Sequence, residues 1–302
     1  MKKAMLRFGW LLKTIRNIAE EFAVEVSVPT PVSGDARDSW LLDFYGQKAH
    51  LARSNALHIS ATSALVGSCF CIQKVFRIED AGTPYHLSEF SLFECAIPRT
   101  DCLACMDRVE GMIRRIQCEA VEAFGQNEVA VLCQEPFVRL DWIDAVNKVC
   151  SIGHVDFNHS PGADVHLDLS HVCVKENAPI FLVDLPQGQV SWACKDMADG
   201  RKVSFNLIVP YAGEVSEGGE RETDRGLLMD RFKRANRMPQ LSWYASSIEK
   251  VESPLSVFAI GLERLAMWLF KYDDIGDVNG FLRKRCFPEI KLEDSGGTCA
   301  EG

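Results

Sequence analysis

The sequence contains no apolar run that is long enough to cross a membrane. The longest run, around Ala64–Ile72, is broken by Gly67 and Ser68 and falls well short of a bilayer span. Charged side chains inside the N-terminal apolar stretch, and the lack of a small-residue cleavage site, argue against a secretion signal. We therefore expect a cytoplasmic protein without a membrane partner.

Clustered basic residues are also scarce. The 302 residues include 33 lysines and arginines and 42 aspartates and glutamates, a formal net charge of −9, and no segment groups basic side chains with interleaved aromatic residues. A protein that grips a nucleic-acid backbone gains most of its affinity by neutralising phosphates. The acidic balance therefore argues against stable RNA binding, while net charge alone leaves room for a local basic patch.

The sequence lacks the features of a disulfide framework or a standard metal site. Its 12 cysteines, without a secretion signal, indicate reduced thiols. Cys102 and Cys105 form a CxxC pair in a stretch with helical periodicity, and because no second pair lies at zinc spacing we expect buried thiols, with structural zinc as the alternative. Potential ligands also crowd the stretch from His154 to Cys173. Their spacings match no standard motif, so polar surface residues are favoured there over a metal site.

The apolar pattern predicts a single domain over residues 1–294, followed by a tail at 295–302 that we expect to be disordered. Helices are predicted from the N-terminus to Phe22 and at Leu103–Phe124, Asp141–Val149, Asp224–Ala235 and Gly261–Phe270. Strands are predicted at Val24–Val28, Val75–Ile78, Phe90–Ile97, Val129–Leu132, Ile180–Val183 and Val203–Val209. Because most strands follow one another through turns, we expect an α+β fold with a largely antiparallel sheet flanked by helices.

The segment from Lys74 to Glu94 predicts a strand, a turn and a second strand. Because side chains alternate along a strand, Arg77 and Glu79 share one face. A charged pair in otherwise apolar sequence needs a partner, since an unpaired buried charge is costly. From these residues alone, an ordinary ion pair is favoured over an anionic ligand.

Two further segments carry charged residues next to glycines. Phe258–Trp268 predicts a strand that runs through Gly261 into a helix, whose first turn holds Glu263 and Arg264 and could bind an anion or form a surface ion pair. Phe205–Glu222 predicts a strand that opens into a glycine-broken stretch with spaced carboxylates. Such carboxylates suit magnesium, and a solvated charged turn fits the sequence equally well.

The order of these segments is more specific than any one of them. FRxE…HxxEF…E, then GExxxGGxR, then GLERL, resembles the catalytic domain of the class II aminoacyl-tRNA synthetases, aspartyl/asparaginyl branch. Val24–Pro29 is similar to the first motif of that family, which ends in a proline at the dimer interface. Two of the segments look most like asparaginyl-tRNA synthetase and the related archaeal asparagine synthetase, which lacks an anticodon domain. The resemblance implies the class II catalytic-domain fold over almost the whole chain.

The resemblance implies that ATP is a substrate and assigns residues to it. Arg77 is expected to hold the α-phosphate and Arg264 to cover the adenine and reach the γ-phosphate, which makes these two the expected catalytic residues. Glu79 is expected to face the adenine amino group. Phe90 is expected to stack on the ring, and His86 to assist at the γ-phosphate.

The resemblance also implies a magnesium site and an amino-acid site. Glu214 and Glu217 are the expected metal ligands, although the family usually has a serine where Glu217 stands. The residues expected to bind the amino-acid substrate are Ser54, Glu94, Gly218, Gly219 and Arg221.

Several positions depart from the family pattern, mostly at the expected amino-acid end. Ile59 and Ser60 occupy the stretch where aspartyl enzymes carry a lysine that contacts the substrate. The other departures are Asn206 for an aspartate, Tyr85 for an arginine and Val257 for a glycine. The expected nucleotide site is therefore closer to the family than the expected amino-acid site.

These features lead to an expected function. The segment before Val24 is too short for an OB-fold anticodon module, and the charge is acidic, so stable tRNA binding is not expected. We expect an AMP-forming homodimeric ligase that uses ATP and Mg²⁺ to activate aspartate or a related amino acid and transfers it to ammonia or another amine. The alternatives are aminoacyl transfer to tRNA or a carrier protein, and a non-catalytic regulatory paralogue.

Overall fold

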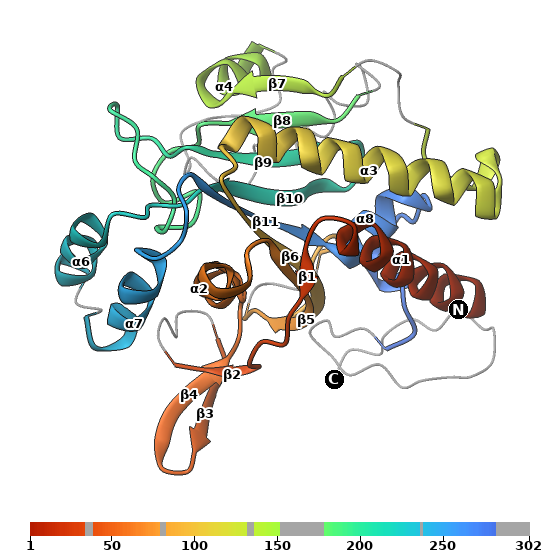
Figure 1. Cartoon of the computed structure of the whole chain (residues 1–302). Helices are drawn as coiled ribbons and strands as arrows, with labels where there is room; N and C mark the ends of the chain where they lie inside the picture. Colours follow the sequence, from red (N-terminus) through yellow and green to blue (C-terminus); the bar gives the residue numbers. More distant parts are fainter. Residues whose placement is uncertain (34–38, 79–82, 132–135, 152–177, 236–237, 282–302) are drawn as a thin grey trace.

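Among the described residues, eight strands form one central sheet (Figure 1). The computed structural model describes residues 1–33, 39–78, 83–131, 136–151, 178–235 and 238–281. The strands are β1 (Val24–Glu25), β5 (Cys69–Phe76), β6 (Glu89–Pro98), β7 (Val138–Asp141), β8 (Ile180–Val183), β9 (Ser204–Val209), β10 (Gly213–Glu220) and β11 (Leu255–Gly261). Their order is β1-β5-β6-β11-β10-β9-β8-β7, and all neighbours are antiparallel except the edge pairs β1–β5 and β7–β8. The predicted α+β fold with a largely antiparallel sheet is confirmed.

Helices cover both faces of this sheet (Figure 1). One face packs against α1 (Lys2–Glu20), α3 (Cys102–Phe124) and α8 (Leu262–Leu269). The other packs against α2 (Ala56–Val66), α6 (Arg225–Arg234) and α7 (Met238–Ile248), with α4 (Trp142–Ser151) beside β7 and β8. Short 3₁₀ turns lie at Gln126–Glu128 and Ile275–Asp277. Within the described part of the chain, no helix is both long and apolar enough to span a bilayer.

The register of the strands decides which residues face which layer of helices. Glu94 is aligned with Ala259, Ala259 with Glu217, and Glu217 with Asn206, so these four side chains share one face of the sheet. The neighbouring phenylalanines on the strands point the other way, into the core under α3. The face with the charged residues is therefore the one that α2, α6 and α7 cover only in part.

The start of α3 contains the CxxC pair. Asp101 caps the helix by accepting a hydrogen bond from the Ala104 backbone N–H at 2.8 Å. Cys102 and Cys105 then lie on the buried face of the helix, which confirms the predicted burial of both thiols. Burial raises the pKa of Cys102 to about 12, so the thiol stays protonated at neutral pH.

A small three-stranded sheet projects from the central sheet (Figure 1). Its strands are β2 (Pro31–Val32), β3 (Leu41–Phe44) and β4 (Gln47–Leu51), paired in the order β2-β4-β3. Tyr45 and Gly46 form the hairpin turn with φ of 54° and 78°, and the Gly46 N–H donates to Asp43 at 2.7 Å. The chain returns from this hairpin directly into α2, which borders the site described below.

Three of the predicted strands differ from the structure. The strand predicted at Val75–Ile78 is displaced, because β5 runs from Cys69 to Phe76 and includes only the first two of those residues. The strand predicted at Val129–Leu132 is wrong over its described part, because Ala130 donates its N–H to the Leu269 carbonyl at the end of α8 (2.8 Å) and pairs with no strand. The strand predicted at Val24–Val28 is shorter, since the β1 ladder with β5 spans only its first two residues. The helices α2 and α7, the strand β10 and the small sheet had not been predicted.

The segment Gly213–Glu220 is a buried strand rather than the solvated turn considered above. It pairs with β9 on one side and β11 on the other, with a β-bulge between Glu214 and Ser216. Glu214 pairs with Ile208 and Ser216 with Leu207, so Val215 is the extra residue. The bulge turns Glu214 to the same face as Glu217, which simple alternation along the strand would not do.

We predict that Gly218→Ala destabilises the protein whereas Gly111→Ala does not. A Cβ at position 218 would lie 2.4 Å from the Phe205 ring and 2.9 Å from Phe258 Cβ, so the core must shift at a cost of about 1–3 kcal/mol. A Cβ at position 111 in α3 meets nothing within 4 Å, and alanine there is expected to add roughly 0.5–1 kcal/mol. Urea unfolding measures both changes. Equal stability of the two variants would contradict the placement of β10 in the core.

Candidate active site

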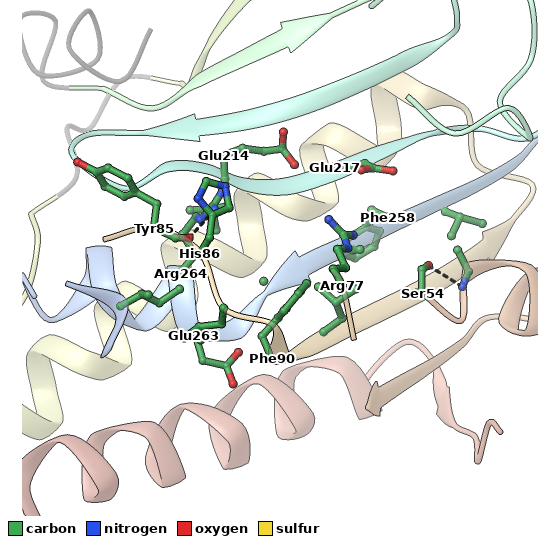
Figure 2. A pocket seen from close by; sticks show the side chains of 18 of the residues that line it. Ser54, Arg77, Tyr85, His86, Phe90, Glu214, Glu217, Phe258, Glu263 and Arg264 are labelled. Atoms are coloured by element: carbon green, nitrogen blue, oxygen red, sulfur yellow. Dashed lines mark hydrogen bonds between the residues drawn. The ribbon is translucent and has the colours of Figure 1, made fainter. Parts of the chain in front are cut away.

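A cleft of about 270 Å³ lies on the face of the sheet opposite α3, along β6, β11 and β10 (Figure 2). The predicted site residues that line it are Ser54, Arg77, His86, Phe90, Glu214, Glu217, Arg221 and Arg264. Glu94, Gly218 and Gly219 are not among its lining residues. Glu79, the His154–Cys173 stretch and the tail at 295–302 lie outside the described residues. The fold thus brings together most of the residues that the resemblance had singled out.

Arg77 and Phe90 form one wall of the cleft. The backbone N–H of Arg77 donates to the Ser88 carbonyl (3.0 Å), and its guanidinium carbon lies 5.3 Å from the centroid of the Phe90 ring. Figure 2 shows these two side chains facing Glu214 and Glu217 across the cleft. An aromatic face beside a fixed cation is suited to a planar ring that carries a phosphate chain.

Arg264 forms the far end of the cleft and is held by backbone carbonyls. Its Nη1 donates to the Glu214 carbonyl at 2.9 Å and its Nη2 to the Tyr85 carbonyl at 2.7 Å. Carbonyl groups fix the orientation of the guanidinium without cancelling its charge, so the side chain can still bind an anion. His86 lines the same end, where its Nδ1 is hydrogen-bonded to Thr83 Oγ1 at 2.5 Å.

Glu263 is buried and connects α8 to the sheet. It therefore does not form the surface ion pair that the sequence analysis considered for this turn of the helix. Its carboxylate is 1% exposed and accepts hydrogen bonds from the N–H of Ser91 (2.8 Å), its Oγ (2.9 Å) and Lys74 Nζ (3.2 Å). Burial raises its pKa, against the lowering effect of these donors. The link fixes the first turn of α8 and with it Arg264.

Glu214 and Glu217 provide two carboxylates on the cleft face of β10. The Glu214 carboxylate accepts a hydrogen bond from Asn206 Nδ2 at 2.8 Å, and Glu217 is aligned with Asn206 and Ala259. Magnesium is commonly held by one or two carboxylates together with the phosphates of a nucleotide. This donor set fits that pattern, although the described residues contain no cluster of three or more protein ligands.

Glu94 lies beneath the cleft and anchors the start of α2. It is fully buried, accepts hydrogen bonds from the Asn55 N–H on both carboxylate oxygens (3.0 and 2.8 Å), and is also bonded by Ser54 Oγ. Burial raises the pKa of Glu94, while the hydrogen bonds and the nearby Arg77 oppose that shift. Glu94 therefore positions Ser54, which does line the cleft, instead of lining it directly.

Arg221 closes the opposite end of the cleft from Arg264. It is 5% exposed, its Nη1 donates to the Cys194 thiol at 3.4 Å, and its Nε is buried with no hydrogen-bond partner. Gly219 allows this packing, because a Cβ there would lie 2.6 Å from the Val203 carbonyl and 3.1 Å from the Cys194 sulfur. The glycine thus serves packing, and the arginine is left with donor capacity toward the cleft.

The departures from the family pattern have different structural consequences. Ile59 is fully buried in the apolar core between α2 and α7, next to Tyr244, so the position carries no charge and does not line the cleft. Val257 lines the cleft from β11. The resemblance therefore placed Val257 correctly, whereas the burial of Ile59 could not be predicted because α2 and α7 had not been recognised as packing partners.

Comparison with known proteins agrees with this geometry. The family model for class II tRNA synthetases (D, K and N) matches residues 13–285. A protein of Enterocytozoon bieneusi named as a probable cytoplasmic asparagine–tRNA ligase is 30% identical over 95% of this chain and 65% of its own length. The cytoplasmic asparagine–tRNA ligase of Saccharomyces cerevisiae is 26% identical over 92% of this chain and 54% of its own length.

A solved structure shows the same fold. The asparaginyl-tRNA synthetase of Entamoeba histolytica in complex with asparaginyl-adenylate superposes with a TM-score of 0.86 at 21% identity, over 95% of this chain and 68% of that one. The fold is therefore that of a class II synthetase catalytic domain. Together with the match of the family model, this shows that the chain belongs to the class II tRNA synthetases of the D, K and N group.

The comparisons revise the expected acceptor. These relatives are named as tRNA ligases, which runs against the expectation that tRNA binding is absent, and none of them is an asparagine synthetase. The chain spans between 54% and 65% of the length of these two curated relatives.

We predict that Glu94→Gln flattens the pH dependence of stability. Because burial raises the pKa of Glu94 above its ordinary 4.5, the folded state keeps a proton that the unfolded state loses as the pH rises past 4.5. The free energy of unfolding should fall with rising pH until the folded-state pKa is passed, and the glutamine variant should lose this component. Urea unfolding at a series of pH values measures this dependence of the free energy of unfolding on pH. The control is Glu122→Gln, because Glu122 is exposed on α3. If the free energy of unfolding of Glu94→Gln varied with pH as steeply as that of the wild type, the raised pKa of Glu94 would be contradicted.

Proposed function

We propose that residues 1–294 form a catalytic domain that uses ATP to activate asparagine and transfers it to tRNA with release of AMP. The observation that carries the proposal is the arrangement of Arg77, Phe90 and Arg264 around one cleft, with Glu214 opposite (Figure 2). Family membership and the names of the relatives support the choice of substrates. Because two of these relatives are named as cytoplasmic, we propose the same location.

The reaction needs no protein nucleophile. The carboxylate of the amino acid attacks the α-phosphorus of ATP, the bond to the β-phosphate oxygen breaks, and pyrophosphate leaves. A hydroxyl of the tRNA then attacks the acyl carbon of the adenylate, loses its proton, and displaces AMP. In the first step charge grows on the phosphate oxygens, where preorganised cations stabilise it.

The residues of the cleft have distinct parts in this scheme. Phe90 stacks under the adenine, Arg77 lies at the α-phosphate, and Arg264, held in place by two carbonyls, lies at the far end of the triphosphate. Glu214, oriented by Asn206, would hold Mg²⁺ on the phosphates, where the ion adds further positive charge.

We further propose a homodimer formed through the region around β1. This strand is at the edge of the central sheet, and its Val24 side chain is 55% exposed. An exposed edge strand with an apolar side chain is a surface that proteins commonly cover. The proposal agrees with the family's first motif at Val24–Pro29.

We predict that Arg77→Ala and Arg264→Ala each lower asparagine-dependent ATP–pyrophosphate exchange by about 100-fold or more, because each removes a fixed cation from the phosphates. Arg115→Ala is the control, since Arg115 pairs with Glu21 and Glu119 on the surface outside the cleft. Wild-type exchange in both cleft variants would refute the assigned roles.

The acceptor is tested separately with labelled asparagine and total tRNA. Acid-precipitable label that depends on ATP is the expected result. AMP release that requires aspartate and ammonia or another amine, and proceeds without tRNA, would instead support the asparagine synthetase-like reaction.

A further inference from the structure

The loop at 83–88 forms the end of the cleft where Arg264 lies. It is neither helix nor strand, so contacts with other parts of the chain must fix its position. Its Tyr85 carbonyl accepts one of the two hydrogen bonds that hold the Arg264 guanidinium, and its His86 ring lines the cleft. Figure 2 shows these three residues gathered at one end of the cleft. Whatever fixes the loop therefore also fixes two of the groups expected at the triphosphate.

A short turn that follows α8 makes a contact with this loop. Lys271 leaves the helical backbone with a φ of 59°, which ends α8, and the chain beyond it forms the 3₁₀ turn at Ile275–Asp277. The backbone N–H of Ile275 donates to the Pro84 carbonyl at 2.8 Å. The Ile275 side chain is itself buried and lines the cleft. The turn thus closes the same end of the cleft that the loop forms.

Asp274 shapes this turn. Its carboxylate accepts a hydrogen bond from the Gly276 N–H at 2.6 Å, as aspartate commonly does at the start of a helical turn. At the other end of the turn, Val278 is fully buried in the core. Because both ends of the turn are fixed in this way, the N–H of Ile275 is held toward the Pro84 carbonyl.

The contact at Pro84 acts on the carbonyl group that holds Arg264. Pro84 and Tyr85 are neighbours in the chain, and because a peptide unit is planar, a movement of the Pro84 carbonyl also moves the backbone of Tyr85. If the bond from Ile275 were lost, the Tyr85 carbonyl could leave the guanidinium, whose other bond to the Glu214 carbonyl would remain. The arginine would then stay in the cleft but lose part of its fixed orientation.

We propose that Asp274 and Ile275 are positioning residues for the outer phosphates of ATP: through the Pro84 carbonyl they hold the loop at 83–88 where Tyr85 orients Arg264. The proposal rests on the proposed function and deepens it. Because the two residues act through the loop and not on the reacting atoms, their loss should weaken the binding of ATP more than that of a nucleotide without outer phosphates.

The test is calorimetric titration with a non-hydrolysable ATP analogue and with AMP, each with Mg²⁺. Asp274→Ala removes the carboxylate and Ile275→Pro removes the N–H. Proline fits the first position of a helical turn, and Asp274 already has the extended backbone (φ −129°, ψ 132°) that precedes a proline. In each variant the ratio of affinities for the analogue and for AMP should fall by about 5-fold or more, because an orienting hydrogen bond is lost. Asp274→Asn and Ile275→Val, which keep the acceptor and the N–H, should retain the wild-type ratio.

Asp43→Ala is the matched control, because Asp43 also accepts a hydrogen bond from a glycine N–H in a turn, that of Gly46 at 2.7 Å, and no described residue of that hairpin lines the cleft. It should leave the ratio unchanged. A wild-type ratio in both Asp274→Ala and Ile275→Pro, with or without a loss of stability in urea, would overturn the proposal while leaving the proposed function intact. Absence of analogue binding by the wild type would overturn the proposed function and the inference with it.

Discussion

The β-bulge in β10 is the constraint on which the chemistry of the cleft depends. A strand with regular alternation would turn Glu214 and Glu217 to opposite faces, and one of the two carboxylates would then enter the core under α3. The extra residue at Val215 restores both to one face, and the strand then continues in phase to Arg221. One inserted residue thus places Glu214, Glu217 and Arg221 on the side of the sheet that faces the cleft.

The cleft also requires small residues on the sheet beneath it. Gly261 and Ala259 line the cleft with little side chain, so the charged residues stand around space that larger side chains would fill. The charges that enter the interior are hydrogen-bonded to backbone groups or to neighbouring side chains, as at Arg264 and Glu263. Arg221 is likewise bonded to a neighbouring side chain, since its Nη1 donates to the Cys194 thiol.

Several helices and strands, and most of the residues that line the cleft, could be predicted from the sequence. The helices α3 and α8 and the strand β6 follow strong local periodicity, and Arg77, Phe90 and Arg264 stand in ordered motifs. The strand β10 could not be predicted, because its glycines and carboxylates resemble a solvated turn and the bulge breaks the alternation. The burial of Glu94 depends on the Asn55 N–H at the start of α2, a contact 39 residues distant in the chain. The helix α7 had a usable signal in the spacing of Leu241, Tyr244, Ala245 and Ile248, all of which are buried.

A crystal structure with a non-hydrolysable asparaginyl-adenylate analogue and Mg²⁺ tests the account most directly. We expect the adenine on Phe90, the phosphate position beside Arg77, and the amino-acid side chain at the Arg221 end of the cleft. An empty cleft, or an analogue bound with its adenine away from Phe90 and its phosphate away from Arg77, would contradict the account.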